Sequence, residues 1–150
     1  MSAETRASPV EILLVEDNPG DVRLTEKAFE EVKLSNNLHV TTDGVEAMAF
    51  LRGEGEFADA PRPDIVLLDL NLPKKDGAEV LAEVKTDDDL KDIPIVVLTS
   101  SEAEEDVIET YNNHANAYLT KPVNFEGFTE IVKKIEGFWF TLVKFPPDDA

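Results

Sequence analysis

The chain has 150 residues, with 32 acidic against 14 basic side chains and a formal net charge of −18. Such a field repels the phosphates of nucleic acids, so we expect no direct binding to nucleic acid. There is no apolar run near the roughly 20 residues that a membrane helix needs, and the absence of cysteine excludes disulfides and thiolate chemistry.

The first predicted strand, residues 10–15, is a short apolar run that ends in two adjacent acids, Glu16 and Asp17. Asn18-Pro19 follows, and this pair suits the cap and the first turn of a helix, which we predict over 19–33. Taken alone, Glu16 and Asp17 would be no more than a solvated turn beside a helix cap.

The next elements continue the alternation of strand and helix. A second strand is predicted over 38–42, with Asp43-Gly44 as the turn after it, and a helix over 45–51. The segment 52–63 contains two glycines and two prolines, and we interpret it as a surface loop rather than a domain boundary.

The third predicted strand is a continuous apolar run that ends at Asp69. Such runs are typical of strands buried on both faces of a parallel sheet. A carboxylate is too costly to bury unpaired, so we expect Asp69 at the carboxyl edge of the sheet, where open α/β folds bind their ligands. The simpler alternative for Asp69 is a helix cap or turn acid, and Asp76-Gly77 then leads into a predicted helix over 77–86.

The rest of the chain repeats the pattern twice, with strands predicted over 95–98 and 117–120, and helices over 102–113 and from near Asn124. Thr99 follows the first of these strands and Lys121 follows the second. Strand and helix patterns thus alternate about five times. This alternation predicts an α/β fold, a doubly wound five-stranded parallel sheet with helices on both faces.

Polar side chains at the ends of these strands could share one crevice. Carboxylates without histidine or cysteine suit Mg²⁺, so Glu16, Asp17 and Asp69 are candidate ligands. A carboxylate is also a competent nucleophile toward phosphorus. Lys121 would neutralise phosphoryl charge, and the Thr99 hydroxyl would donate to a phosphoryl oxygen. The pattern predicts phosphoryl transfer by positioning and electrostatics.

Over about residues 10–137, the sequence resembles the receiver domain of two-component response regulators. Four motifs carry the resemblance: Leu14-Val15-Glu16-Asp17-Asn18, Leu68-Asp69-Leu70-Asn71-Leu72-Pro73 with Asp76-Gly77, Leu98-Thr99-Ser100, and Tyr118-Leu119-Thr120-Lys121-Pro122. Each motif alone is weak, but four in the right order, each at a strand end, are specific. The resemblance implies the flavodoxin-like receiver fold.

For the acceptor and the metal, the resemblance implies specific roles. Asp69 would accept a phosphoryl group from a phosphohistidine on a sensor histidine kinase. Glu16 and Asp17 would bind Mg²⁺ directly or through water, together with Asp69 and the main-chain carbonyl of Asn71. Glu16 departs from the pair of aspartates that many relatives carry.

For the switch, the resemblance implies that Thr99 and Lys121 contact the phosphoryl oxygens. Tyr118 would be a rotating aromatic side chain that follows the position of Thr99, with core packing as its simpler alternative. The bond between Lys121 and Pro122 would be cis.

The loop 52–63, the segment 72–77 and the aromatic C-terminal region look most similar to stand-alone regulators of the cyanobacterial phytochrome type. That narrower resemblance implies a sensor histidine kinase of the photoreceptor type as the partner. The segment after Lys121 is too short for a DNA-binding or enzymatic domain, so we expect the output to be an interaction. We expect a signalling domain and not an enzyme. The N-terminus lacks the features of a signal peptide, so we expect the protein in the cytoplasm.

The C-terminal segment carries more apolar surface than one core-facing stripe requires. Its apolar residues fall into two rows: Phe128, Ile131, Ile135, Phe138 and Leu142 in one, and Phe125, Val132 and Trp139 in the other. One row would cover the sheet, and the other predicts a homodimer through Phe125–Leu142. An ordinary core helix with a packed tail is the alternative. We expect one domain over 10–143, between a flexible N-terminus, 1–9, and a flexible acidic tail, 144–150.

Two other functions remain open. A scaffold, or pseudo-receiver, would bind partners without phosphorylation, and it is disfavoured because Asp69 and Lys121 are both present. A metal-dependent phosphatase with an aspartyl-phosphate intermediate usually carries a second acid where this chain has Asn71. The acids are spread along the whole chain, which favours a surface adapted to high salt, as in halophiles, over an acidic interaction patch.

Overall fold

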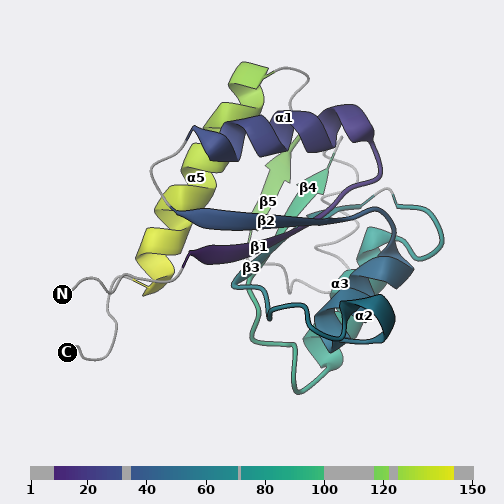
Figure 1. The fold of residues 1–150 in the computed structure, drawn as a ribbon. Helices are drawn as coiled ribbons and strands as arrows, with labels where there is room; N and C mark the ends of the chain where they lie inside the picture. Colours follow the sequence, from purple (N-terminus) through teal and green to yellow (C-terminus); the bar gives the residue numbers. More distant parts are fainter. Residues whose placement is uncertain (1–8, 32–34, 71, 100–116, 122–124, 144–150) are drawn as a thin grey trace.

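The computed structural model describes residues 9–31, 35–70, 72–99, 117–121 and 125–143. Figure 1 draws the other residues as a thin grey trace. The helix expected over 102–113 and the two terminal segments, 1–8 and 144–150, lie outside the described residues. Those expectations therefore stay predictions.

The centre of the fold is a parallel sheet of five strands in the order β2-β1-β3-β4-β5. The strands are β1 (Val10–Val15), β2 (Asn36–Thr41), β3 (Ile65–Asp69), β4 (Ile95–Thr99) and β5 (Ala117–Thr120). From β1 the chain steps to β2 on one side, and later to β3 and onward on the other. The strand order therefore changes direction between β1 and β3, which is where such sheets open a crevice at their carboxyl ends.

Helices cover both faces of this sheet (Figure 1). They are α1 (Pro19–Glu30), α2 (Gly44–Arg52), α3 (Gly77–Thr86) and α5 (Phe125–Val143), with a short 3₁₀ turn, η1 (Gly55–Phe57), before β3. α1 and α5 lie side by side on one face, and α2 and α3 lie on the other. The predicted α/β fold with a parallel sheet and helices is confirmed.

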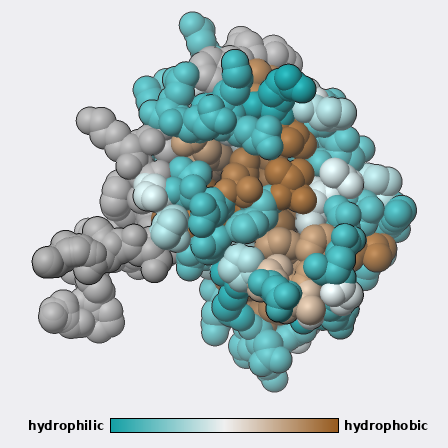
Figure 2. Space-filling model, in the orientation of Figure 1, coloured by the Kyte–Doolittle hydropathy of each residue, from teal (hydrophilic) through white to brown (hydrophobic). Residues whose placement is uncertain are grey.

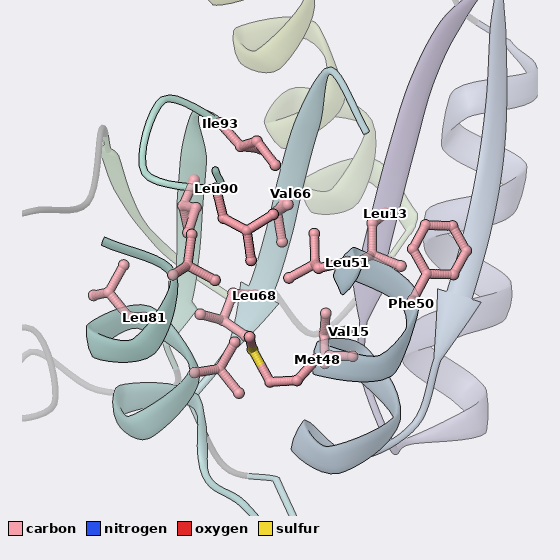
Figure 3. Packing of buried hydrophobic residues seen from close by; sticks show 14 of the residues in the cluster. Leu13, Val15, Met48, Phe50, Leu51, Val66, Leu68, Leu81, Leu90 and Ile93 are labelled. Atoms are coloured by element: carbon pink, nitrogen blue, oxygen red, sulfur yellow. The ribbon is translucent and has the colours of Figure 1, made fainter. Parts of the chain in front are cut away.

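Alternate residues of the central strands face the two helical layers. Leu13 and Val15 of β1 pack with α2 and α3, whereas Ile12 and Leu14 pack with α1 and α5. Figure 3 shows the first of these layers, where Leu68 of β3 meets side chains of α2 and α3. Because both faces are buried, these strands are apolar at almost every position, with Glu11 in β1 and Asp69 at the end of β3 as exceptions, which is why they were recognisable in the sequence.

Side chains cap the helices that follow the strands. The Asn18 Oδ1 accepts from the Asp21 amide at 3.1 Å, as the sequence predicted, and Asp43 caps α2 by accepting from the Glu46 amide at 2.7 Å. The chain bends at Asp43 as predicted, but α2 begins one residue earlier than expected, at Gly44. The loop 52–63 contains the short 3₁₀ turn η1.

The assignment of the two apolar rows of α5 was wrong for Val132. Phe128 and Val132 were placed in different rows, but each is 1% exposed and both lie in the cluster beneath α1. They are four residues apart, so they share one face of the helix. The side chains of the other row members lie outside the described residues. Among the described helices, none is both long and apolar enough to span a bilayer.

The Thr41 hydroxyl is buried without a hydrogen-bond partner in the described part of the chain. Replacing it with a methyl group removes a polar atom that gains nothing from burial. We therefore expect Thr41→Val to raise the free energy of unfolding by about 1 kcal/mol. Urea unfolding monitored by circular dichroism measures this change.

Thr25 is the matched control for Thr41. It is also buried, but its hydroxyl donates to the Asp21 carbonyl at 2.8 Å. Thr25→Val should therefore lower the free energy of unfolding by about 1 kcal/mol. Equal shifts of the same sign in both variants would show that the Thr41 hydroxyl is satisfied in solution.

Candidate functional site

Three carboxylates meet at the point where the strand order changes direction. Glu16 and Asp17 directly follow β1, and Asp69 is the last residue of β3. One oxygen from each lies within 4.8 Å of the others. Glu16 is 1% exposed and Asp69 is 3% exposed, whereas Asp17 is open to solvent. The Glu16 amide donates to the Thr41 carbonyl at 3.0 Å, which fixes the backbone at this end of β1.

Lys121, which follows the edge strand β5, brings a positive charge to these acids. Its Nζ lies 2.9 Å from the Glu16 Oε1 and 3.3 Å from the Asp69 Oδ2. A third carboxylate, that of Asp21 in the first turn of α1, lies at 2.7 Å from Nζ. Lys121 follows β5, so its side chain reaches past β4 to the central strands. The ammonium offsets part of the repulsion among the acids.

Burial alone would lower the pKa of Lys121, but hydrogen bonds to Asp21 and Glu16 outweigh this effect and raise that pKa above its usual value. Lys121 is therefore charged at neutral pH. Burial raises the pKa of Glu16 to about 7, with a further increase from its hydrogen bond with Asp69, although Lys121 opposes the shift. Without a cation, Glu16 thus tends to retain a proton near neutral pH.

These residues fit a hard divalent cation. The donor set consists of carboxylate oxygens alone, and the proton retained by Glu16 marks an excess of buried negative charge that a cation would relieve. Glu16, Asp17 and Asp69 are the side chains that would hold it. The predicted ligand at the Asn71 carbonyl lies outside the described residues.

The structure brings four sequence-predicted site residues together: Glu16, Asp17, Asp69 and Lys121. Thr99 is the last residue of β4, next to Leu98, which is paired with Asp69. The side chains of Thr99 and Tyr118, and the whole of Pro122, lie outside the described residues. Their predicted roles remain predictions.

Asp21 is the site residue that sequence reasoning missed. The available signal was its place in the first turn of the helix that begins directly after Glu16 and Asp17. An acid in that turn is favourable in almost any helix, so the pattern did not distinguish a site residue from an ordinary one.

The loop after Asp69 is packed closely against the starts of two helices. The Gly77 amide donates to the Leu70 carbonyl at 3.0 Å. A Cβ at Gly77 would lie 2.4 Å from the Asp69 carbonyl oxygen, and one at Gly44 would lie 1.9 Å from the Lys75 carbonyl oxygen. Both glycines are therefore required by close backbone approach, and they fix the path of the chain beyond Asp69.

An open groove of about 510 Å³ leads away from the acids along α1 toward β2. Glu16 and Asp17 lie at one end, and Val22 and Val40 contribute apolar surface to its lining. Figure 2 shows an apolar area between α1 and β2, surrounded by mostly hydrophilic surface. The groove thus reaches Glu16 and Asp17, whereas Asp69 is not part of its lining.

Comparisons with known proteins agree with this geometry. A family model described as the response regulator receiver domain matches residues 12–133. Response regulator Rcp1 of Synechocystis sp. is 50% identical over 146 residues, which are 97% of this chain and 99% of Rcp1.

Two solved structures are also similar. The crystal structure of the phosphorylated cyanobacterial phytochrome response regulator RcpA superposes with a TM-score of 0.82 at 50% identity, covering 90% of this chain and 96% of RcpA. The Mn²⁺-bound form of Rcp1 superposes with a TM-score of 0.79 at 51% identity, covering 87% of this chain and 94% of that chain.

Proposed function

The chain belongs to the response regulator receiver domain family, and we propose that Asp69 is the residue on which it accepts a phosphoryl group. The observation that carries this proposal is the position of the Asp69 carboxylate. It is almost buried at the end of β3, within 4.8 Å of two other acids and 3.3 Å from the Lys121 ammonium. A nucleophile, a cation site and a fixed positive charge are therefore in one place.

The donor is a phosphohistidine of a sensor histidine kinase. An Asp69 oxygen attacks phosphorus, a P–O bond forms as the P–N bond breaks, and the imidazole of the donor leaves. Lys121 neutralises part of the charge on the phosphoryl oxygens, and Thr99 donates a hydrogen bond to one of them. Glu16, Asp17 and Asp69, with the Asn71 carbonyl, would hold a Mg²⁺ ion, which would supply further charge stabilisation.

The phosphorylated state signals by changing the shape of its surface and by binding a partner. Thr99 and Tyr118 move together toward the phosphoryl group and change the surface beside β5 and α5.

The chain forms a homodimer through Phe125–Leu142. Support comes from α5, in which Phe128 and Val132 already cover the sheet while the sequence carries further apolar residues. The name of RcpA as a phytochrome response regulator supports a photoreceptor-type kinase as the donor.

The chain works in the cytoplasm as a signalling domain, and not as an enzyme that turns over a free substrate. The similarity to Rcp1, which is named a response regulator, supports the signalling role. Residues 10–143 belong to one domain in this proposal. The net charge of −18 supports a surface adapted to high salt.

Intact-protein mass after incubation with acetyl phosphate tests the assignment. With Mg²⁺ in high salt, we expect a single phosphoryl adduct that is stable in acid and labile in base. With EDTA in place of Mg²⁺, we expect at least about tenfold less adduct, because the charge on the phosphoryl oxygens is then balanced by Lys121 alone. If a folded, Mg²⁺-binding protein forms no adduct even at the shortest times, the phosphorylation-independent scaffold replaces this proposal.

A further inference from the structure

We propose that Asp21 is a positioning residue. Its ion pair with Lys121 restrains the ammonium and so weakens the binding of a phosphoryl group at Asp69. The inference rests on the proposed function, because it takes Asp69 as the phosphoacceptor. It adds a regulatory role for a side chain of α1 that is neither a nucleophile nor one of the proposed metal ligands.

The first step of the argument is the number of hydrogen bonds that Lys121 makes. An ammonium has three N–H donors. The Lys121 Nζ lies 2.7 Å from Asp21, 2.9 Å from Glu16 and 3.3 Å from Asp69. Three carboxylates thus match the three donors, and a phosphoryl oxygen can gain a hydrogen bond from Lys121 only if one carboxylate gives up its own.

The second step is to compare how easily each carboxylate can lose its hydrogen bond from Lys121. The side chain of Glu16 is 1% exposed and that of Asp69 is 4% exposed, whereas that of Asp21 is 22% exposed. A buried carboxylate that loses its donor stays unsatisfied, but a half-exposed one is hydrated by water. Asp69 carries the phosphoryl group itself, so its contact with Lys121, the longest of the three, is replaced by one with a phosphoryl oxygen. Of the two contacts that remain, the one with the partly exposed Asp21 is the one that Lys121 can loosen as it follows the group. That contact is the shortest of the three, so it opposes phosphoryl binding.

The third step is that the Asp21 carboxylate can be changed without disturbing α1. The hydrogen bonds that anchor this turn use the main chain of Asp21, since its amide donates to Asn18 and its carbonyl accepts from Thr25. Asp21→Asn keeps the shape and these two bonds and removes the charge. The effect of the substitution should therefore appear at Lys121 and not in the fold.

Beryllium trifluoride, a mimic of a phosphoryl group on a carboxylate, is the probe for this test. Its affinity is measured by fluorine NMR at saturating Mg²⁺ in the unsubstituted protein, in Asp21→Asn and in Glu26→Gln. Glu26 is an exposed acid on the same helix, so its substitution controls for net charge. We expect Asp21→Asn to bind about fivefold more tightly, the size of one partly exposed ion pair, and Glu26→Gln to change by less than about twofold.

A second readout separates positioning from a structural role. The side-chain nitrogen resonance of Lys121 should shift in Asp21→Asn before the probe is added, and Asp21→Glu should restore both this resonance and the affinity. If Asp21→Asn does not fold, Asp21→Ser provides the same comparison with a hydroxyl in the first turn.

Two results would overturn the inference alone. Weaker binding in Asp21→Asn would mean that Asp21 presents Lys121 to the phosphoryl group rather than withholding it. Equal changes in Asp21→Asn and Glu26→Gln would mean that only net charge matters. Absence of binding in the unsubstituted protein and in every variant would overturn the assignment of Asp69 itself, and this inference with it.

Discussion

The Asp69→Asn variant should form no phosphoryl adduct and should fold as the unsubstituted protein does. An amide has the shape of the carboxylate but lacks its nucleophilic oxygen, so we expect the yield of adduct to fall at least about a hundredfold. The fold should survive because Asp69 is one of three acids that repel one another, and its hydrogen bond with Glu16 contributes to the raised pKa of that residue. Removing one negative charge therefore does not leave an uncompensated one.

Intact-protein mass with acetyl phosphate and Mg²⁺ measures this loss, and thermal unfolding checks the fold. Asp59→Asn is the control, since Asp59 is an exposed acid in the loop before β3 and is not part of the site. An adduct of ordinary yield in Asp69→Asn would place the acceptor on another side chain.

A methyl group at Gly77 should strongly destabilise the fold next to Asp69. The new Cβ would lie 2.4 Å from the Asp69 carbonyl oxygen and 2.7 Å from the Leu70 Cα. These are backbone atoms at the end of a central strand, so they cannot move aside as a flexible side chain would. We expect Gly77→Ala to lower the free energy of unfolding by about 3 kcal/mol and to weaken Mg²⁺ binding, because Asp69 must shift.

Gly137 provides the opposite case within the same chain. It lies in α5, is exposed, and a Cβ there meets nothing within 4 Å. Gly137→Ala should therefore raise the free energy of unfolding by about 0.5–1 kcal/mol, the usual gain of alanine over glycine in a helix. Urea unfolding of both variants measures the difference, and equal stability would mean that the chain beyond Asp69 yields readily to the added methyl group.

Much of the fold was predictable because its signals are local. β1, β5 and α3 have the bounds expected from apolar runs and helix caps. β2 begins at Asn36, earlier than expected, because an edge strand tolerates polar residues such as Asn36 and Asn37. The pair Asp43-Gly44 suits a turn and a helix start equally well, and only the helix that follows decides between them.

The site was predictable where strand ends determine it. Glu16, Asp17, Asp69 and Lys121 come together because parallel strands bring their carboxyl ends to one edge. The contact between Asp21 and Lys121 was not predictable, since it joins the first helix to the segment after the last strand. No local pattern encodes such a pairing. The burial of Val132 depends in the same way on α1, which packs beside α5.

The reach of Lys121 past β4 bears on how the protein matures during synthesis. The three acids leave the ribosome well before residue 121, so a nascent chain carries the negative charges of the site without their counter-charge. The centre becomes complete only when β5 has docked on β4, a late and long-range event. A chain in which β5 has not yet docked therefore lacks the ammonium that offsets the repulsion among Glu16, Asp69 and their neighbours.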